Sequence, residues 1–250
     1  VLFRLGRYAD AVRWYRRVTA PSALAASAAY REARSYVRDG RAEEGRELLR
    51  RVVRTWPKDS AAASARYLLA DLATDSRQDS LARATFRQVT ERHPGSRLAP
   101  SSAFRAAMIA YIDGRPRMAA VEFDSLRQRW PKSDEVAASL YWAGRAWADA
   151  GDSMTARNRW QSAMAWDSAS YYSESSARRL GVASWEPAPA DDVFLSAPDL
   201  EATAARAELL ERLGMDDEAD AERARFTRQA GSAADRLLAA ADMMRRRGRP

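Results

Sequence analysis

The sequence predicts an all-α fold in which helical hairpins stack into a superhelix, an α-solenoid. A 37-residue repeat runs without a gap and keeps residue types in register. The clearest columns are aromatic (Tyr30, Tyr67, Phe104, Tyr141), small (Ala33, Ala70, Ala107, Gly144) and bulky apolar (Leu49, Phe86, Phe123, Trp160). A fixed period of roughly 20–50 residues is typical of solenoids, in which each repeat buries its apolar face against the next. Such chains are usually scaffolds or binding surfaces, so catalysis needs a separate argument.

Each repeat is predicted to be a helical hairpin. In the first complete repeat, apolar residues recur with helical spacing from Tyr30 to Val37 and again from Ala42 to Trp56. Asp39-Gly40 separates the two stretches, and glycine there can take the left-handed conformation that ends a helix. Its equivalents are Ser76-Arg77, which specifies the turn less clearly, Asp113-Gly114 and Ala150-Gly151. A proline then stops each second helix, at positions 57, 94 and 131.

The pattern divides the chain into three regions. Residues 1–168 hold the repeats, with clear units at about 26–62, 63–99, 100–136 and 137–168, and the chain begins just before the second helix of an earlier repeat. Residues 169–198 hold a helix with two adjacent tyrosines and then a crossover rich in proline and aromatic residues, which we expect to be ordered. Residues 199–250 read as a degenerate hairpin and a final helix from about Ala233 to Arg247.

The formal charge of +7 comes almost entirely from arginine. One interpretation is a surface for an anionic partner: nucleic acid, an acidic protein or a polymer with carboxylates. The favoured interpretation is that arginines occupy solvated helix faces in a chain with a GC-rich coding bias. Nucleic acid is disfavoured because the arginines are spread among 34 acidic residues, and no basic cluster with interleaved aromatic residues is present apart from the terminal Arg245-Arg246-Arg247. No apolar run is long enough to cross a bilayer.

The sequence offers no convincing site for chemistry. Cysteine is absent, and the single histidine, His93, occupies the repeat position of Trp56 and Trp130, which indicates a packing or helix-end role. A Ser-His-Asp triad and a histidine metal site are thus disfavoured. The pairs Asp191-Asp192 and Asp216-Asp217 each precede or open a predicted helix, where carboxylates cap. We therefore expect no active site, cofactor or metal in this chain.

The repeats over residues 1–168 resemble the tetratricopeptide family, in the long-period form common in bacterial envelope proteins, which implies fold more than function. A narrower resemblance covers about residues 135–250. There the segments Tyr141–Ala146 (YWAGRA), Gly151-Asp152, Tyr171-Tyr172 and Ala177–Gly181 (ARRLG) are similar, in kind and order, to the helical region of the soluble lytic murein transglycosylases.

That resemblance implies a role. In this family the helical region leads into a lysozyme-like domain that cleaves peptidoglycan glycan strands, using a glutamate in an E-S motif with several companion motifs. The full set of these motifs is not found here. Glu174-Ser175 lies within the segment that resembles the helical region, so we interpret it as non-catalytic. The chain would then be a periplasmic, cell-envelope fragment, positioning a glycan strand on a basic concave face and bracing a catalytic domain beyond residue 250. Tyr171, Tyr172, Arg178 and Arg179 are the candidate domain contact, with ordinary packing between hairpins as the alternative.

Two other functions stay open from the sequence. One is a protein–protein interaction scaffold, such as an envelope-assembly lipoprotein or a cell-division coordinator, with envelope proteins as partners in place of glycan strands. The other is a cytoplasmic repeat adaptor. The parent gene would discriminate among the three functions. It continues into a lysozyme-like domain if the chain belongs to a lytic transglycosylase and does not if the chain is a scaffold, and the gene of a cytoplasmic adaptor would lack an export signal upstream.

Overall fold

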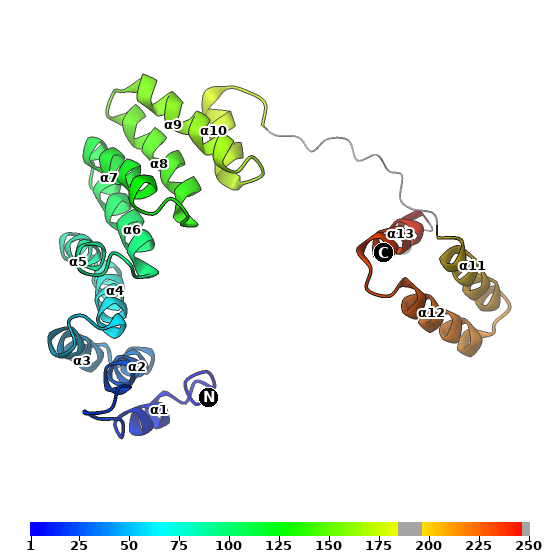
Figure 1. Ribbon diagram of the computed structural model, residues 1–250, viewed down its shortest axis with the longest axis horizontal. Helices are drawn as coiled ribbons and strands as arrows, with labels where there is room; N and C mark the ends of the chain where they lie inside the picture. The colour runs from blue at the N-terminus through cyan, green and yellow to red at the C-terminus, as the bar shows by residue number, and fades with distance from the viewer. Residues whose placement is uncertain (185–196, 247–250) are drawn as a thin grey trace. The chain divides into compact units, whose positions relative to one another are not determined.

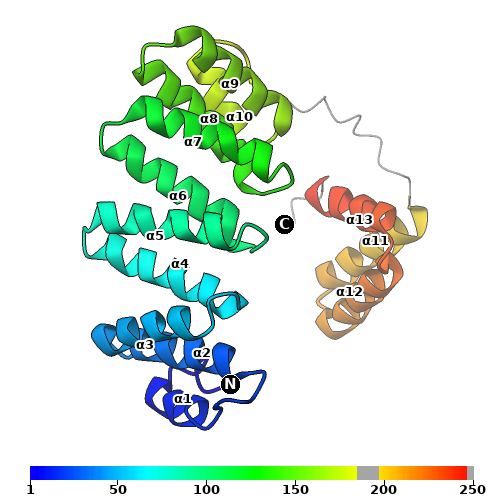
Figure 2. The same ribbon diagram turned by 60° about the vertical axis from the view of Figure 1, so that its left-hand side comes forward.

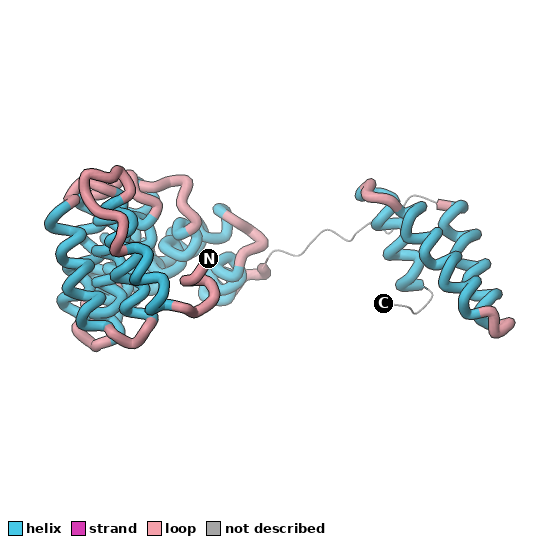
Figure 3. Tube along the Cα trace, turned by 90° about the horizontal axis from the view of Figure 1, so that it is seen from below, coloured by secondary structure: helices cyan, strands magenta, loops and turns pink. Residues whose placement is uncertain are grey.

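The computed structural model describes residues 1–184 and 197–246, and these residues form helices joined by loops, with no strand among them (Figure 3). The chain divides into two compact units, Val1–Trp185 and Glu186–Pro250. The helices of the N-terminal unit are α1 (Tyr8–Tyr15), α2 (Ala25–Arg38), α3 (Ala42–Thr55), α4 (Ser60–Asp75), α5 (Asp79–Arg92), α6 (Leu98–Ile112), α7 (Pro116–Arg129), α8 (Glu135–Asp149), α9 (Ser153–Trp166) and α10 (Tyr171–Leu180). The predicted all-α solenoid is confirmed.

In the N-terminal unit the hairpins α2–α3, α4–α5, α6–α7 and α8–α9 stack one on another (Figure 2). Each first helix also packs against the next first helix, so α2 contacts α4, α4 contacts α6, α6 contacts α8 and α8 contacts α10. The second helices α3, α5, α7 and α9 show no comparable packing on one another. The stack therefore curves toward its first helices, which line the concave side of this unit (Figure 1).

The repeat columns form the core. Ala33, Ala70 and Ala107 are fully buried, and each shares a hydrophobic cluster with the bulky residue 16 positions later, on the second helix of its own hairpin. The aromatic column packs on the same residues, since the ring centroids of Tyr67 and Phe86 lie 5.5 Å apart. The small residue lets the two helices approach, and the bulky residue fills the space beside it.

The turn inside each hairpin has one conformation in all four clear repeats. Gly40, Gly114 and Gly151 have φ angles of 80°, 73° and 85°, and Arg77 takes the same left-handed conformation with a φ of 56°. The hydrogen bond that closes the turn is also kept, because the Gln78 N–H donates to the Ala73 carbonyl at 2.8 Å as its equivalents do elsewhere. Packing of the hairpin thus imposes the turn on a residue that disfavours it.

Replacing Arg77 with glycine is expected to stabilise the protein. The left-handed conformation costs a non-glycine residue about 1–2 kcal/mol, and glycine removes this cost from the folded state. Glycine's greater freedom in the unfolded chain offsets about 0.5–1 kcal/mol of that stabilisation. The net increase in the free energy of unfolding should be about 0.5–1 kcal/mol, measured by urea denaturation. The reverse change at the equivalent position, Gly114→Arg, should lower it, and a loss of stability in Arg77→Gly would contradict this account.

The C-terminal unit contains α11 (Pro198–Arg212), α12 (Asp216–Ala230) and α13 (Ala234–Arg246). Helices α11 and α12 form a hairpin around Gly214, whose φ is 71°. Asp216-Asp217 lies in the first turn of α12, but the N-cap residue is Met215 and neither aspartate makes a side-chain capping hydrogen bond. Its small core consists of Leu200, Ala204, Ala230, Ala240 and Met243. Most of the predicted crossover, with Trp185, Phe194 and Asp191-Asp192, lies outside the described residues, as does Arg247.

Candidate interaction surface

The exposed face of the first helices differs from repeat to repeat, in contrast to the constant packing columns. Three neighbouring columns face the concave side, and we call them together the concave surface. Their members are Arg31, Leu68, Arg105 and Trp142; Arg34, Asp71, Met108 and Arg145; and Arg38, Asp75, Ile112 and Asp149. All twelve are exposed or half-buried. Leu68, Met108 and Trp142 also pack against hydrophobic core clusters, but all twelve side chains keep exposed surface that is available for recognition.

On the concave surface an ion pair connects α4 and α6. The Arg105 guanidinium pairs with the Asp71 carboxylate and lies 4.7 Å from the centre of the Phe86 ring. Burial raises the pKa of Asp71, while the Arg105 guanidinium opposes that effect. This pair holds two successive first helices together and neutralises the charges of Asp71 and Arg105.

From α6 to α10 the surface becomes aromatic. Ring contacts run from Tyr111 to Trp142 (5.7 Å between centroids), Trp142 to Tyr141 (5.6 Å), Tyr141 to Tyr172 (5.9 Å) and Tyr172 to Tyr171 (5.4 Å). We call these five residues the aromatic strip. The Arg145 guanidinium lies 4.8 Å from the centre of the Trp142 ring, within the range of a cation–π contact. The ring contacts are edge-on or tilted, and tryptophan, tyrosine and arginine are the residue types enriched at binding hot spots.

The sequence-predicted residues are only partly brought together. Tyr171 and Tyr172 end the aromatic strip, with Tyr171 75% exposed and Tyr172 half-buried. Arg178 and Arg179 lie exposed near the end of α10, and the Arg178 Nε donates to the Glu174 carboxylate at 2.9 Å. A contact with a further domain stays a prediction.

Sequence reasoning missed Tyr111, Trp142 and Arg145. Tyr111 and Trp142 join α6 to α8 in the strip, and the Arg145 guanidinium contacts both of their rings. The available signal was the change of residue type along otherwise regular columns.

The expected basic concave face is wrong as a general description. Arg31, Arg34 and Arg38 make the α2 end positive, but α4 contributes Asp71 and Asp75 in the matching columns. Positive charge is therefore concentrated on α2, whereas α6 and α8 each contribute one arginine to these columns, Arg105 and Arg145.

The two residues that most resembled catalytic groups have structural surroundings. His93 ends α5, as the helix-end interpretation predicts, and its Nε2 lies 2.7 Å from Arg66 Nη1. Hydrogen bonds from Ser184 and Arg178 lower the pKa of Glu174, which suits an ionised surface carboxylate and not a general acid. Within residues 1–184 and 197–246 no cluster of histidines and carboxylates has the arrangement of a metal site, and no helix has the length and apolarity to span a bilayer.

Comparison with known proteins supports the repeat assignment. Residues 27–59 and 64–96 match the tetratricopeptide repeat family. A crystal structure of MamA is similar, with a TM-score of 0.51, 15% identity, and coverage of 71% of this chain and 95% of MamA. YrrB, described as a TPR protein with an unusual peptide-binding site, has a TM-score of 0.50 and 17% identity, covering 71% and 87% of the two chains.

At these identities the likeness shows the fold alone. No curated protein sequence matches the chain, and the matches give no support to an origin in a lytic transglycosylase. The two matched repeats and the stacked hairpins show a tetratricopeptide-like α-solenoid fold.

Proposed function

We propose that this chain is a non-catalytic scaffold that binds a segment of a partner protein on its concave surface. The observation that carries the proposal is the contrast between constant packing columns and variable concave columns within one chain. Tryptophan, tyrosine and arginine dominate binding energy at protein interfaces. The aromatic strip with Arg145 supplies all three at one end of the surface.

The charge pattern specifies the partner segment further. Arg31, Arg34 and Arg38 on α2 favour acidic side chains, whereas Trp142 and Tyr172 favour apolar or aromatic ones. Asp71 and Arg105 neutralise each other between these ends. A segment that is acidic at one end and apolar at the other fits the surface, and its direction follows from the charge.

Peptide selection tests the proposal. A displayed random-peptide library is selected on the protein, and the affinity of the selected peptides is measured by fluorescence anisotropy. Trp142→Ala is expected to weaken binding by at least about 30-fold, because central interface tryptophans contribute about 2 kcal/mol or more. Met154→Ala, at a 77% exposed position on α9, is the matched control and should bind as the native chain does. Equal binding by Trp142→Ala would place the interaction elsewhere.

A second candidate is peptidoglycan binding as the helical region of a cell-envelope lytic transglycosylase, which would place the protein in the periplasm. Its support is the sequence resemblance over Tyr141–Gly181 and the aromatic strip, since flat rings can stack on sugar rings. A pulldown with peptidoglycan sacculi at low and moderate salt, with a muropeptide-release assay on the same samples, tests this. Salt-sensitive binding without release would support it, and no binding at either salt would leave the protein scaffold alone.

A further inference from the structure

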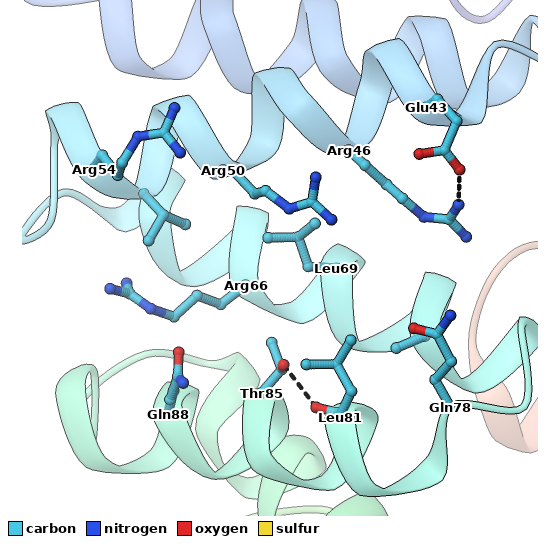
Figure 4. Close-up of a pocket in the computed structure, with 12 residues that line it drawn as sticks. Glu43, Arg46, Arg50, Arg54, Arg66, Leu69, Gln78, Leu81, Thr85 and Gln88 are labelled. Atoms are coloured by element: carbon cyan, nitrogen blue, oxygen red, sulfur yellow. Dashed lines mark hydrogen bonds and ion pairs between the residues drawn. The ribbon is translucent and has the colours of Figure 1, made fainter.

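A second groove lies on the opposite side of α4 from the concave surface. It has a volume of about 440 Å³ and runs between α3 and α5 (Figure 4). Residues 66, 69 and 73 of α4 form its floor, half a helical turn away from the concave positions 68, 71 and 75. Four arginines line it: Arg46, Arg50 and Arg54 from α3 and Arg66 from α4.

Arg66 is the unusual member of this groove. Its side chain is buried, with the residue 5% exposed, and its Nε has no hydrogen-bond partner. Its Nη1 contacts His93 Nε2 at 2.7 Å, and none of the described carboxylates forms an ion pair with it. Burial and the nearby Arg92 guanidinium lower the pKa of Arg66. Burying a guanidinium without a paired carboxylate destabilises the folded protein, so this groove favours the binding of an anion.

Three neighbouring grooves each contain an ion pair that the groove between α3 and α5 lacks. The groove between α1 and α3 contains an Arg16–Glu32 pair at 2.8 Å. The next two are bridged by Arg83–Glu122 at 2.5 Å, between α5 and α7, and by Arg159–Asp124 at 2.6 Å, between α9 and α7. Each of the three thus contains an ion pair formed by residues of this chain.

The groove between α3 and α5 lacks such a bridge. One repeat period relates Glu32 to Leu69 and Thr85 to Glu122, so apolar and hydroxyl side chains stand where the neighbours have carboxylates. Thr85 donates its hydroxyl to the Leu81 carbonyl of its own helix at 2.7 Å. The carboxylates that pair with Arg46, Arg50 and Arg54 are Glu43 and Glu47 of the same helix, whose side chains are 77% and 65% exposed.

We propose that this groove binds an acidic peptide segment of a partner protein, whose carboxylate takes the place that Glu32 and Glu122 occupy in the neighbouring grooves. A peptide suits the lining better than a phosphate-bearing polymer does. Leu69 and the 53% exposed Leu81 offer an apolar patch beside the guanidinium groups. Gln78 and Gln88 can both donate to and accept from a peptide backbone. The site is separate from the concave surface and gives the scaffold a second, charge-selective contact.

The probe is a fluorescent peptide in which glutamate alternates with valine, measured by anisotropy at about 50 mM salt, where surface charges are weakly screened. The native chain is expected to bind it. Arg50→Gln and Arg66→Met should each weaken binding at least tenfold. A peptide with glutamine in place of glutamate should not bind, and a single-stranded oligonucleotide of equal charge should bind more weakly. Tighter binding of the oligonucleotide, or equal binding of the glutamine peptide, would overturn the proposal.

The decisive variant is Thr85→Glu, which places a carboxylate where Glu122 lies in the next groove. It should reduce peptide binding at least tenfold and raise the melting temperature, so loss of binding cannot be attributed to unfolding. Unchanged binding in this variant would overturn the proposal. Trp142→Ala should leave this binding unaltered, which separates a failure here from a failure of the concave surface.

A site-specific signal is available, because His93 is the only histidine and contacts Arg66. Its ring NMR resonances should shift on peptide addition. Binding without a shift would place the peptide outside the groove.

Discussion

Replacing Phe123 with alanine is expected to lower the free energy of unfolding by about 3–5 kcal/mol, the range for removing a buried aromatic side chain. Phe123 is 1% exposed and packs with Ala107, Ala120 and Ala143 in the cluster that joins α6, α7 and α8. Its ring centroid lies 5.4 Å from that of Phe104. Removing the ring leaves a cavity between two successive hairpins, and rigid neighbouring helices can close it only in part.

The measurement is guanidinium denaturation followed by far-ultraviolet circular dichroism, with limited proteolysis beside it. Proteolysis is needed because a solenoid is held by contacts between neighbouring repeats, so its weakened part can open before the rest. Ile112→Ala, at a 73% exposed position in the preceding helix, is the control and should change stability by less than about 0.5 kcal/mol. A loss below about 1 kcal/mol in Phe123→Ala would mean that the bulky column does not carry the stacking.

The fold was accessible from the sequence because the repeat encodes it redundantly. Each bulky residue of the column, such as Phe86, recurs at a fixed distance from a small residue, so one correct register places every hairpin. Arg77 shows the limit of local reasoning. Its turn is specified by the packing of the α4–α5 hairpin and by the bond from Gln78, and not by its own residue type.

The candidate sites were harder to predict, for a physical reason. Binding surfaces combine residues from several repeats, so they depend on which helices touch. Tyr172 was singled out from a motif, yet its contact with Tyr141 exists only because α10 packs on α8. Arg66 did leave a signal, since it interrupts a column whose other members are Ala29, Ala103 and Leu140. An arginine is conspicuous in this column because its other members are apolar.

Gly144 and Trp160 provide the sharpest test of how the columns fit together. In the other clear repeats an alanine lies beside leucine or phenylalanine, whereas here the smallest residue lies beside the largest. A Cβ at Gly144 would come within 2.6 Å of Trp160 Cδ1, which no real contact shows. The indole is held in place, because it is 8% exposed and its Nε1 donates to the Tyr141 carbonyl at 3.2 Å.

Gly144→Ala should therefore destabilise the protein despite the better helix propensity of alanine. Overpacking costs about 1–3 kcal/mol, and the propensity gain of about 1 kcal/mol offsets only part of it. Trp160→Phe alone should also destabilise, because it leaves space beside Gly144. The double variant recreates the Ala107–Phe123 pair of the preceding repeat, so most of the loss should be recovered, with a coupling free energy of about 1–3 kcal/mol in a double-mutant cycle measured by urea denaturation. If the two losses simply add, α8 and α9 accommodate a methyl group by moving apart, and the matched sizes in the two columns do not set the distance between helices.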